Sequence, residues 1–416
     1  MSLARPSDTT LGRPWPESLW AVVAVGATLY IAVRYSHKGG LVNVGFYLPA
    51  LALVAHTLST RGHELAALFR SRLGAAALAF AAALTWSVAI APDVPHSADA
   101  FAKAHGHALA VALFVGIAAT RRRAFPFLLG ALVVGAVPEM LNQIGHHWRQ
   151  WRETGRWMID YPLAREYGDA YALYLPACVA MLVVTRVPGL RAAGWAFALL
   201  QSILLLLTGF RGAWLGASAG VLVGALAARA WKATLVLGAA GVMAILALGA
   251  VSPTNLVSER LSRGLDTSNR VAETWMPALD LIAEKPLTGY GYGKEVFARS
   301  YESAQPQHPE WPRPPWLERT PWGPHNIYLG AMLAGGIFLF ATMLWLFAEI
   351  ALAYVRAWRS FGPSAAGALA LGGLGALVSA YWVHGLFEEK FWPPLGILIG
   401  LALGLDRMRR AGAVLG

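Results

Sequence analysis

Long runs of apolar residues alternate with short polar connections along almost the whole chain. The runs contain about 17 to 25 residues, the length that a helix needs to cross a bilayer. Because a chain in lipid must satisfy its backbone polar groups internally, we expect these runs to be helices. The pattern predicts an all-α polytopic membrane protein with about twelve spans, at 16–34, 41–59, 73–91, 102–120, 124–144, 168–186, 192–208, 213–229, 233–251, 325–348, 364–384 and 392–406.

One connection, 252–324, is far longer than the others. It contains a helix-like stretch at 268–283, then Gly289-Tyr-Gly-Tyr-Gly293, then a segment rich in proline and tryptophan. Proline restricts the backbone, so we expect a semi-rigid lid and not a flexible tether. The predicted organisation is therefore spans 1–9 within 1–251, a loop domain over 252–324, and spans 10–12 within 325–416.

Basic residues are shared unequally between the two sides of the predicted membrane. The connections on the side of the two termini are richer in arginine and lysine, so the positive-inside rule assigns both termini to the cytoplasm. The connections at 145–167, 209–212, 252–324 and 385–391 then all lie on the exported side. The first apolar run leads into Tyr35-Ser36-His37-Lys38 without a small-x-small cleavage site, so we interpret it as a retained span.

Composition agrees with this picture and narrows the function. The chain is 56% hydrophobic and 14% charged, with a mean hydropathy of +0.49. The net charge of +11 is spread over short loops, which favours contacts with membrane lipids over nucleic acid. Cys178 is the only cysteine, so no intramolecular disulfide can form.

Two polar strings open apolar runs on the exported side. Arg211, flanked by glycines, lies at a tight turn with room for a ligand, and His325 lies between Pro324 and Asn326 at the start of a predicted helix. An imidazole with its ordinary pKa of about 6.5 accepts a proton from a hydroxyl near neutral pH, so His325 is the general base that we favour. The ordinary alternatives are lipid-headgroup contact or helix capping for Arg211 and a carbonyl hydrogen bond for His325.

Other charged segments allow two interpretations each. Arg270 lies in the helix-like stretch of the long loop, where it could equally pair with Glu273 or Glu259 on an exposed surface. The exported segment from His146 mixes tryptophans with arginines that include Arg149 and Arg152. This segment is typical of an interfacial helix, and a substrate-contacting role for its arginines is the alternative.

Several motifs carry weaker signals. Gly289-Tyr-Gly-Tyr-Gly293-Lys294 lacks the Walker spacing and its strand-turn-helix context, so we predict a turn and no nucleotide cofactor. The pairs His105 with His107 and His146 with His147 lack the companion ligands of a metal site, so no metal is predicted. Exported carboxylates leave a carboxylate-base or metal-assisted mechanism open, although loop solvation or pairing with arginine is simpler: Asp93, Asp99, Asp160, Glu166, Asp169, Glu388 and Glu389.

Three pieces in order resemble the O-antigen ligase and polymerase family of bacterial envelope membrane proteins. They are Arg211-Gly-Ala-Trp214, then Asn269-Arg270 with Trp275 and Pro286-Leu-Thr-Gly-Tyr-Gly-Tyr-Gly293, then His325-Asn-Ile-Tyr-Leu329 with Gly335-Gly-Ile337. The resemblance covers about 210–340, and the first half is similar only in hydropathy. It implies a GT-C-like glycosyltransferase acting on undecaprenyl-diphosphate-linked glycans at the periplasmic face of the inner membrane, with Arg211, Arg270 and His325 as the functional set.

The reaction expected from this resemblance is metal-independent, inverting transfer of O-antigen from undecaprenyl diphosphate to lipid A-core. Arg211 and Arg270 would stabilise the departing diphosphate while His325 deprotonates the acceptor hydroxyl. Polymerisation on the same carrier is the nearest alternative, and a lipid-linked oligosaccharide transporter is another, kept open by Glu139, Asn142 and Gln143 near the fifth span. The residues expected to contact substrate are Asn326, Trp214, Tyr290, Tyr292, Trp322, Arg149 and Arg152.

Overall fold

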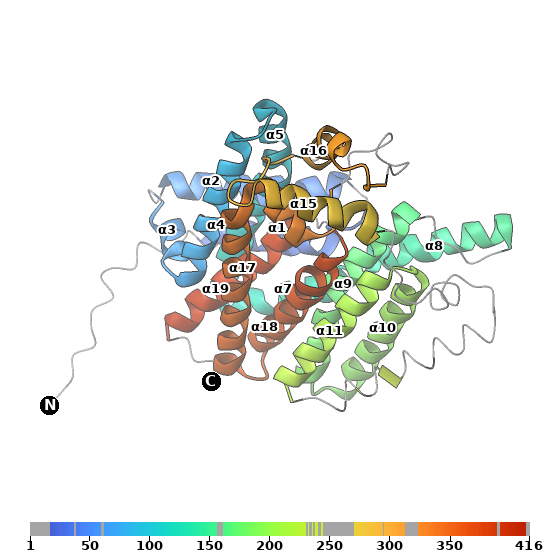
Figure 1. Cartoon of the computed structure of the whole chain (residues 1–416). Helices are drawn as coiled ribbons and strands as arrows, with labels where there is room; N and C mark the ends of the chain where they lie inside the picture. The colour runs from blue at the N-terminus through green and yellow to red at the C-terminus, as the bar shows by residue number, and fades with distance from the viewer. Residues whose placement is uncertain are drawn as a thin grey trace.

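The computed structural model describes residues 17–36, 39–59, 62–155, 161–229, 270–293, 295–312, 323–388 and 392–412, with a few positions between 232 and 243. All regular structure in these ranges is helical (Figure 1). The helices are α1 (Glu17–Val33), α2 (Gly39–Ser59), α3 (His63–Phe69), α4 (Arg72–Ala89), α5 (Val94–Phe101), η1 (Ala102–Gly106), α6 (His107–Ala118), η2 (Arg122–Ala124), α7 (Phe125–Val134), α8 (Val137–Thr154), α9 (Tyr161–Val184), α10 (Pro188–Leu207), α11 (Arg211–Ala227), η3 (Val271–Trp275), α15 (Met276–Glu284), α16 (Val296–Ala304), η4 (Gln305–Gln307), α17 (Ile327–Phe361), α18 (Ala365–Ala376), η5 (Leu377–Val383), η6 (His384–Leu386) and α19 (Trp392–Arg410).

The apolar helices fall where the sequence pattern predicts spans. Among the described residues, seven helices are long and apolar enough to cross a membrane: Arg72–Ala89, Val94–Ala118, Arg122–Thr154, Glu166–Val184, Pro188–Leu207, Ile327–Phe361 and Ala365–Leu386. Shorter apolar helices cover Ser18–Val33, Gly39–Ala55 and Arg211–Ala227, and α19 coincides with the last predicted span. The ninth predicted span, 233–251, lies almost wholly outside the described residues. The prediction of an all-α, multi-pass membrane protein is confirmed.

Small residues let the helices approach closely. In α11, a Cβ atom at Gly216 would collide with the Ser379 carbonyl oxygen, and one at Gly220 would collide with the Gly375 carbonyl oxygen. Both contacts hold α11 against α18 and η5, as the Gly-Ala-Ser-Ala-Gly string predicts. Lipid gives apolar side chains little reason to associate, so such close backbone contacts are an important source of packing energy between membrane helices.

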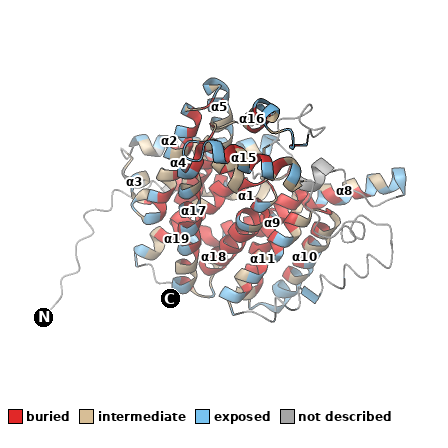
Figure 2. Ribbon diagram, in the orientation of Figure 1, coloured by how far each residue is buried: buried red, intermediate tan, exposed pale blue. Residues whose placement is uncertain are grey.

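Buried residues fill the centre of the bundle (Figure 2), and several large tyrosines are among them. Two of these tyrosines form hydrogen bonds through their hydroxyl groups. The Tyr174 hydroxyl donates to the Ile31 carbonyl oxygen at 2.7 Å, and the Tyr354 hydroxyl donates to the Leu398 carbonyl oxygen at 2.6 Å. A buried hydroxyl without a partner would cost about 1–3 kcal/mol. The first bond therefore joins α9 to α1, and the second joins α17 to α19.

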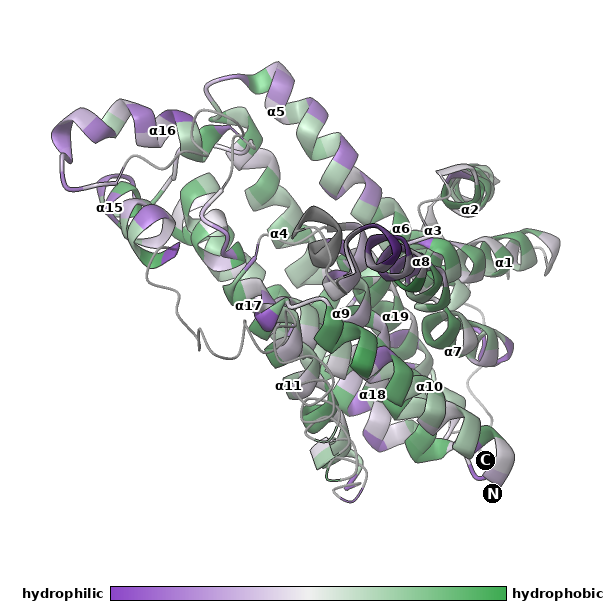
Figure 3. Cartoon of the chain, turned by 90° about the vertical axis from the view of Figure 1, so that its right-hand side faces the viewer, coloured by the Kyte–Doolittle hydropathy of each residue, from purple (hydrophilic) through white to green (hydrophobic). Residues whose placement is uncertain are grey.

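The polar part of the chain gathers at one end of the bundle. Helices α5, α15 and α16 lie at that end, while α19 ends at the other (Figure 1), and hydrophilic residues are frequent on α15, α16 and α8 (Figure 3). The loop domain has a small core of its own, formed by Leu281 of α15, Phe297 and Tyr301 of α16, and Trp311, together with Leu333 of α17. A core of this kind agrees with the expectation of a semi-rigid unit.

The glycine-rich segment joins the loop domain to α17. The backbone N–H of Tyr290 donates to the Leu333 carbonyl oxygen at 2.7 Å, and that of Ile337 donates to the Pro286 carbonyl oxygen at 2.9 Å. Helix α17 is interrupted at this place, because Gly336 has a positive φ of 61° and a Cβ there would collide with the Leu287 carbonyl oxygen. Residues 289–293 form an irregular segment with two bends, directly after a turn at 286–288. The helix itself is longer than the predicted span, since it continues to Phe361 after the kink.

Helix α8 continues past the predicted end of the fifth span and extends away from the bundle (Figure 1). Trp148, Arg149, Trp151 and Arg152 on this extension are exposed, and the two indole rings lie 5.4 Å apart. An exposed helix with tryptophans and arginines fits the interfacial interpretation of this segment. The rest of that segment, 156–160, lies outside the described residues.

Candidate active site

Four segments that are distant in the sequence meet at the polar end of the bundle: the start of α11, the residue before η3, the start of α17, and the turn after η6. π-helical stretches adjoin two places in this region. Arg270 directly precedes η3, and His384, the first residue of η6, directly follows η5. Such π-helical insertions are rare and are frequent at functional sites. They shift the side chains that follow them, which a regular helical periodicity cannot predict.

Glu388 is the common partner of two predicted site residues. Its side chain is fully buried, with Oε1 3.5 Å from Arg270 Nη2 and Oε2 3.4 Å from His325 Nδ1. Arg270 Nη1 also donates to the Phe387 carbonyl oxygen. The carboxylate therefore holds a guanidinium and an imidazole on its two oxygens. The fold brings Arg270 and His325 together, as the family resemblance implies.

The backbone around His325 is specialised for this position. His325 adopts a positive φ of 50°, a conformation that costs a residue with a side chain about 1–3 kcal/mol. The following Asn326 caps α17, because its side-chain oxygen accepts hydrogen bonds from the backbone N–H groups of Tyr328 and Leu329 at 2.9 and 3.1 Å. Thr274 links the same place to η3, since its hydroxyl lies 3.3 Å from the Pro324 carbonyl oxygen. These contacts hold the imidazole in place.

Arg211 begins α11, whose first turn packs against the residues next to Glu388. A Cβ at Gly212 would lie 3.0 Å from His384 Cδ2 and 3.1 Å from Phe387 Cβ, so the helix start and η6 are in direct contact. No side chain caps this helix. The N-terminus of a helix carries a partial positive charge, which adds to the guanidinium charges beside it. This end of the bundle is therefore suited to an anionic ligand.

A second buried carboxylate–imidazole pair lies next to the start of α11. His384 Nδ1 is 3.5 Å from Asp169 Oδ1, and both side chains are almost completely buried. The His384 ring also contacts the Phe210 ring, with centroids 5.0 Å apart. The pair connects α9 to the turn that carries Glu388, and we assign it a positioning role.

The other residues predicted to contact substrate have contacts within the protein. The Trp214 indole N–H donates to the Leu205 carbonyl oxygen at 2.8 Å, which closes the α10–α11 turn. The Tyr290 hydroxyl donates to Glu284 at 2.6 Å, and the Tyr292 ring meets the His105 ring edge-on at 5.1 Å. Trp322 lies outside the described residues. Substrate contact by all of these residues stays a prediction.

Glu388, His384 and Asp169 are site residues that the sequence did not single out. Glu388 and Asp169 were two of several carboxylates predicted on the exported side, and their simplest interpretation was loop solvation or pairing with arginine. For Glu388 this pairing is observed, with Arg270. The available signal was an acidic pair between aromatic residues at the end of a span, Phe387-Glu388-Glu389. Residue 389 lies outside the described part of the chain.

Gln143, one of the three polar residues that kept a transporter open, is engaged in helix packing. Gln143 accepts from the Tyr171 hydroxyl and donates to the Leu204 carbonyl oxygen, both at 2.7 Å.

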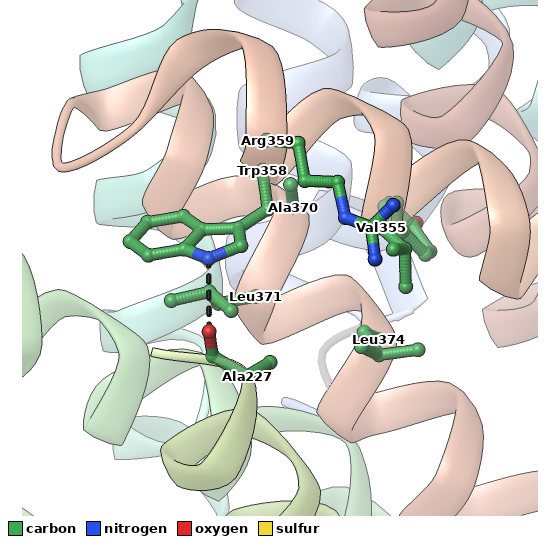
Figure 4. Close-up of a pocket in the computed structure, with 8 residues that line it drawn as sticks. Ala227, Val355, Trp358, Arg359, Ala370, Leu371 and Leu374 are labelled. Carbon is green, nitrogen blue, oxygen red and sulfur yellow. Dashed lines mark hydrogen bonds between the residues drawn. The ribbon is translucent and has the colours of Figure 1, made fainter. Parts of the chain in front are cut away.

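At the opposite end of the bundle, Trp358 Nε1 donates to the Ala227 carbonyl oxygen at 3.0 Å beside a small apolar pocket (Figure 4). Helix α11 separates this pocket from Arg211 by roughly 24 Å, at 1.5 Å per residue. The pocket is therefore not part of the charged site.

Part of the chain is similar to known proteins. A family model described as O-antigen ligase matches residues 196–344, a segment that contains Arg211, Arg270 and His325 but not Glu388. The chain is also similar to an O-antigen ligase of Salmonella typhimurium, with 28% identity over 209 residues, 47% of this chain and 48% of the relative. This match thus spans about half the length of each protein. Over residues 196–344, the chain is therefore similar to O-antigen ligases.

Proposed function

We propose that this protein transfers an O-antigen glycan from undecaprenyl diphosphate to the lipid A-core oligosaccharide, at the periplasmic face of the bacterial inner membrane. The observation that carries the proposal is the meeting of Arg270, His325 and Glu388 beside the first turn of α11, which begins at Arg211. Arginine suits a diphosphate donor, because its planar guanidinium group forms bidentate, charge-assisted hydrogen bonds with phosphate.

In the proposed reaction, the acceptor hydroxyl oxygen bonds to the anomeric carbon as the bond from that carbon to the diphosphate breaks. The hydroxyl proton passes to His325, and the negative charge that develops on the departing diphosphate is stabilised by Arg211 and Arg270. Attack from the face opposite the diphosphate inverts the configuration. No metal ion is needed, because guanidinium groups provide bidentate, charge-assisted hydrogen bonds to phosphate.

Glu388 determines which imidazole nitrogen serves as the base. A carboxylate 3.4 Å from Nδ1 favours the tautomer with its proton on that nitrogen, which leaves Nε2 as the acceptor. The same carboxylate stabilises the imidazolium once it has formed. Glu388 thus orients the base on one oxygen and a phosphate-binding guanidinium on the other.

The donor's polyprenyl chain needs an apolar path to this place. Leu215 and Leu222 are exposed on α11, one and three turns from Arg211, and Leu199 and Leu200 are exposed on α10. A lipid chain along these helices would deliver its diphosphate to the start of α11. We therefore place the donor's tail on this face.

The decisive experiment uses purified protein, carrier-linked glycan as donor, and one of two acceptors. We expect product with lipid A-core and none with a second carrier-linked repeat unit. Product formed only with the second acceptor would replace ligation by polymerisation, which uses the same donor. Movement of labelled glycan across a vesicle membrane without covalent transfer would favour the transporter.

A further inference from the structure

We propose that the loop domain binds a divalent metal ion of the zinc type through Asp280, His308 and Glu310. One ligand atom from each of these residues lies within 4.8 Å of the other two. Asp280 belongs to α15, whereas His308 and Glu310 follow η4. The site is thus formed by two segments about 28 residues apart, in the part of the chain outside the membrane bundle.

The side chains around the cluster hold the ligands in a fixed arrangement. The His308 ring stacks on the Trp311 ring, with centroids 4.3 Å apart and planes only 6° from parallel. The Trp311 indole N–H donates to Asp280 Oδ2 at 3.0 Å. One buried tryptophan therefore orients both the imidazole and the carboxylate, the support that metal-binding side chains receive from their neighbours.

The charges of the cluster favour a cation. His308 Nδ1 lies 3.0 Å from Glu310 Oε1, and His308 Nε2 lies 3.8 Å from Glu284 Oε1. With Asp280, three carboxylates surround one imidazole, and even a protonated histidine leaves them in excess. A divalent ion would neutralise the excess negative charge.

The ligand set indicates which ion. Imidazole with carboxylates suits Zn²⁺, whose sites usually have three or four protein ligands at about 2.0–2.2 Å. Ca²⁺ and Mg²⁺ prefer oxygen ligands only. Closing the present 4.8 Å spread around a zinc ion needs side-chain shifts of about 1 Å, and Glu310 is exposed enough to make them.

Bound metal would fasten 305–312 to α15. The Tyr301 hydroxyl already bonds to the Pro312 carbonyl oxygen, and Trp311 completes the small core of the domain. The chain then continues to Pro324 and His325. The metal is therefore structural in this proposal, and it takes no part in the transfer chemistry.

Metal binding to the whole purified protein, prepared with a tag that contains no histidine, tests the proposal without any transfer assay. After chelation and dialysis, Zn²⁺ titration followed by calorimetry should show one ion per chain and a rise in melting temperature. Co²⁺ should give the visible absorption of a low-coordinate site with a nitrogen ligand. Ca²⁺ and Mg²⁺ should have no such effect at equal concentration.

Variants make the result specific. His308→Ala should weaken Zn²⁺ binding by at least about 100-fold, and Glu310→Gln, at an exposed position that folding tolerates, should weaken it by about 10-fold or more. His96→Ala, which removes an exposed histidine on α5, should leave binding unchanged. Zn²⁺ binding that is equal in the wild type and in both cluster variants, or absent from the folded wild type, would overturn the proposal.

Discussion

The protein contains two clusters in which an imidazole meets carboxylates, and they differ in what balances the negative charge. His325 shares a fully buried Glu388 with Arg270 at the end of the bundle. His308 lies among Asp280, Glu284 and Glu310 on the partly exposed surface of the loop domain. In the first cluster an arginine of the chain supplies the positive charge. In the second, the carboxylates outnumber the one cation that the imidazole can provide.

This difference separates two chemical roles. A buried carboxylate already neutralised by a guanidinium has little affinity for a metal ion, but it can orient an imidazole as a base. An imidazole surrounded by several carboxylates is poorly suited to act as a base. The same group of side chains is well suited to bind a metal ion. Changes at the two clusters should therefore affect different measurements, transfer at the first and metal binding or stability at the second.

The largest expected effect is the loss of transfer when His325 is replaced by asparagine. Asparagine tolerates a positive φ, so His325→Asn removes the base while keeping the backbone conformation. We expect the transfer rate to fall by about 10²–10⁴-fold, the usual contribution of a general base. The rate of product formation with lipid A-core measures the change.

The control for this variant is His96→Asn on the exposed surface of α5, which should transfer at the wild-type rate. Both variants should elute as monodisperse protein with unchanged melting temperatures. Wild-type transfer by His325→Asn would remove the imidazole from the proposed mechanism.

Next in size is the effect of exchanging arginine for lysine at the donor site. Arg211→Lys and Arg270→Lys keep the charge but lose the planar, bidentate geometry that fits phosphate. We expect a reduction in transfer of about 10²–10³-fold for each variant. Arg299→Lys, at an exposed position on α16, is the matched control and should be silent. Equal activity of all three variants would show that charge alone suffices.

A smaller loss is expected for Glu388→Gln, which retains an oxygen acceptor but removes the charge. The imidazole keeps its position, while the imidazolium loses its counter-ion and Arg270 loses its ionic partner. We expect about 10–10²-fold slower transfer, part of the contribution of acid–base catalysis. Glu302→Gln on the exposed face of α16 serves as control. Transfer by Glu388→Gln at the wild-type rate would contradict this role for Glu388.

The membrane helices could be predicted from the sequence because lipid imposes a simple rule on each span. Runs of apolar residues gave spans within a few residues of α1, α4, α10 and α11. The interruption of α17 at Gly335–Gly336 could not be predicted in this way. It depends on the contact of Gly336 with Leu287, some 49 residues earlier, and hydropathy contains no information about such a contact.

The residues of the candidate site that belong to sequence motifs could be predicted. Those that only the fold brings together could not. Arg270 and His325 came from the family resemblance, and in the structure both lie against Glu388, while their roles stay a prediction. Glu388 could not be chosen among seven exported carboxylates, because its burial depends on η5 and η6. The cluster of Asp280 and His308 could not be predicted either. Spacing in the sequence reveals candidate ligands that are adjacent, such as His146 and His147, but not ligands on separate segments.

The glycine that joins the two regions offers a test of their coupling. Gly336→Ala places a Cβ against the Leu287 carbonyl oxygen at a positive φ, so it should destabilise the protein by about 1–3 kcal/mol and displace the loop domain. Gly362→Ala has the same kind of positive φ but no atom within 4 Å. We expect both variants to lower the melting temperature and only Gly336→Ala to slow transfer. Equal transfer by the two would show that docking of the loop domain is dispensable.

The smallest expected effect on transfer is that of a chelator, and it separates the two clusters most directly. EDTA should leave the transfer rate unchanged within about twofold, because guanidinium groups and no metal stabilise the departing diphosphate. It should lower the melting temperature of the wild type, but not that of His308→Ala, because only the wild type loses a bound ion. Strong inhibition that a divalent ion reverses, in His308→Ala as well as in the wild type, would instead assign the metal to the reaction. The carboxylates beside His325 would then have to bind it, and the positive charge of Arg270 next to Glu388 argues against this arrangement.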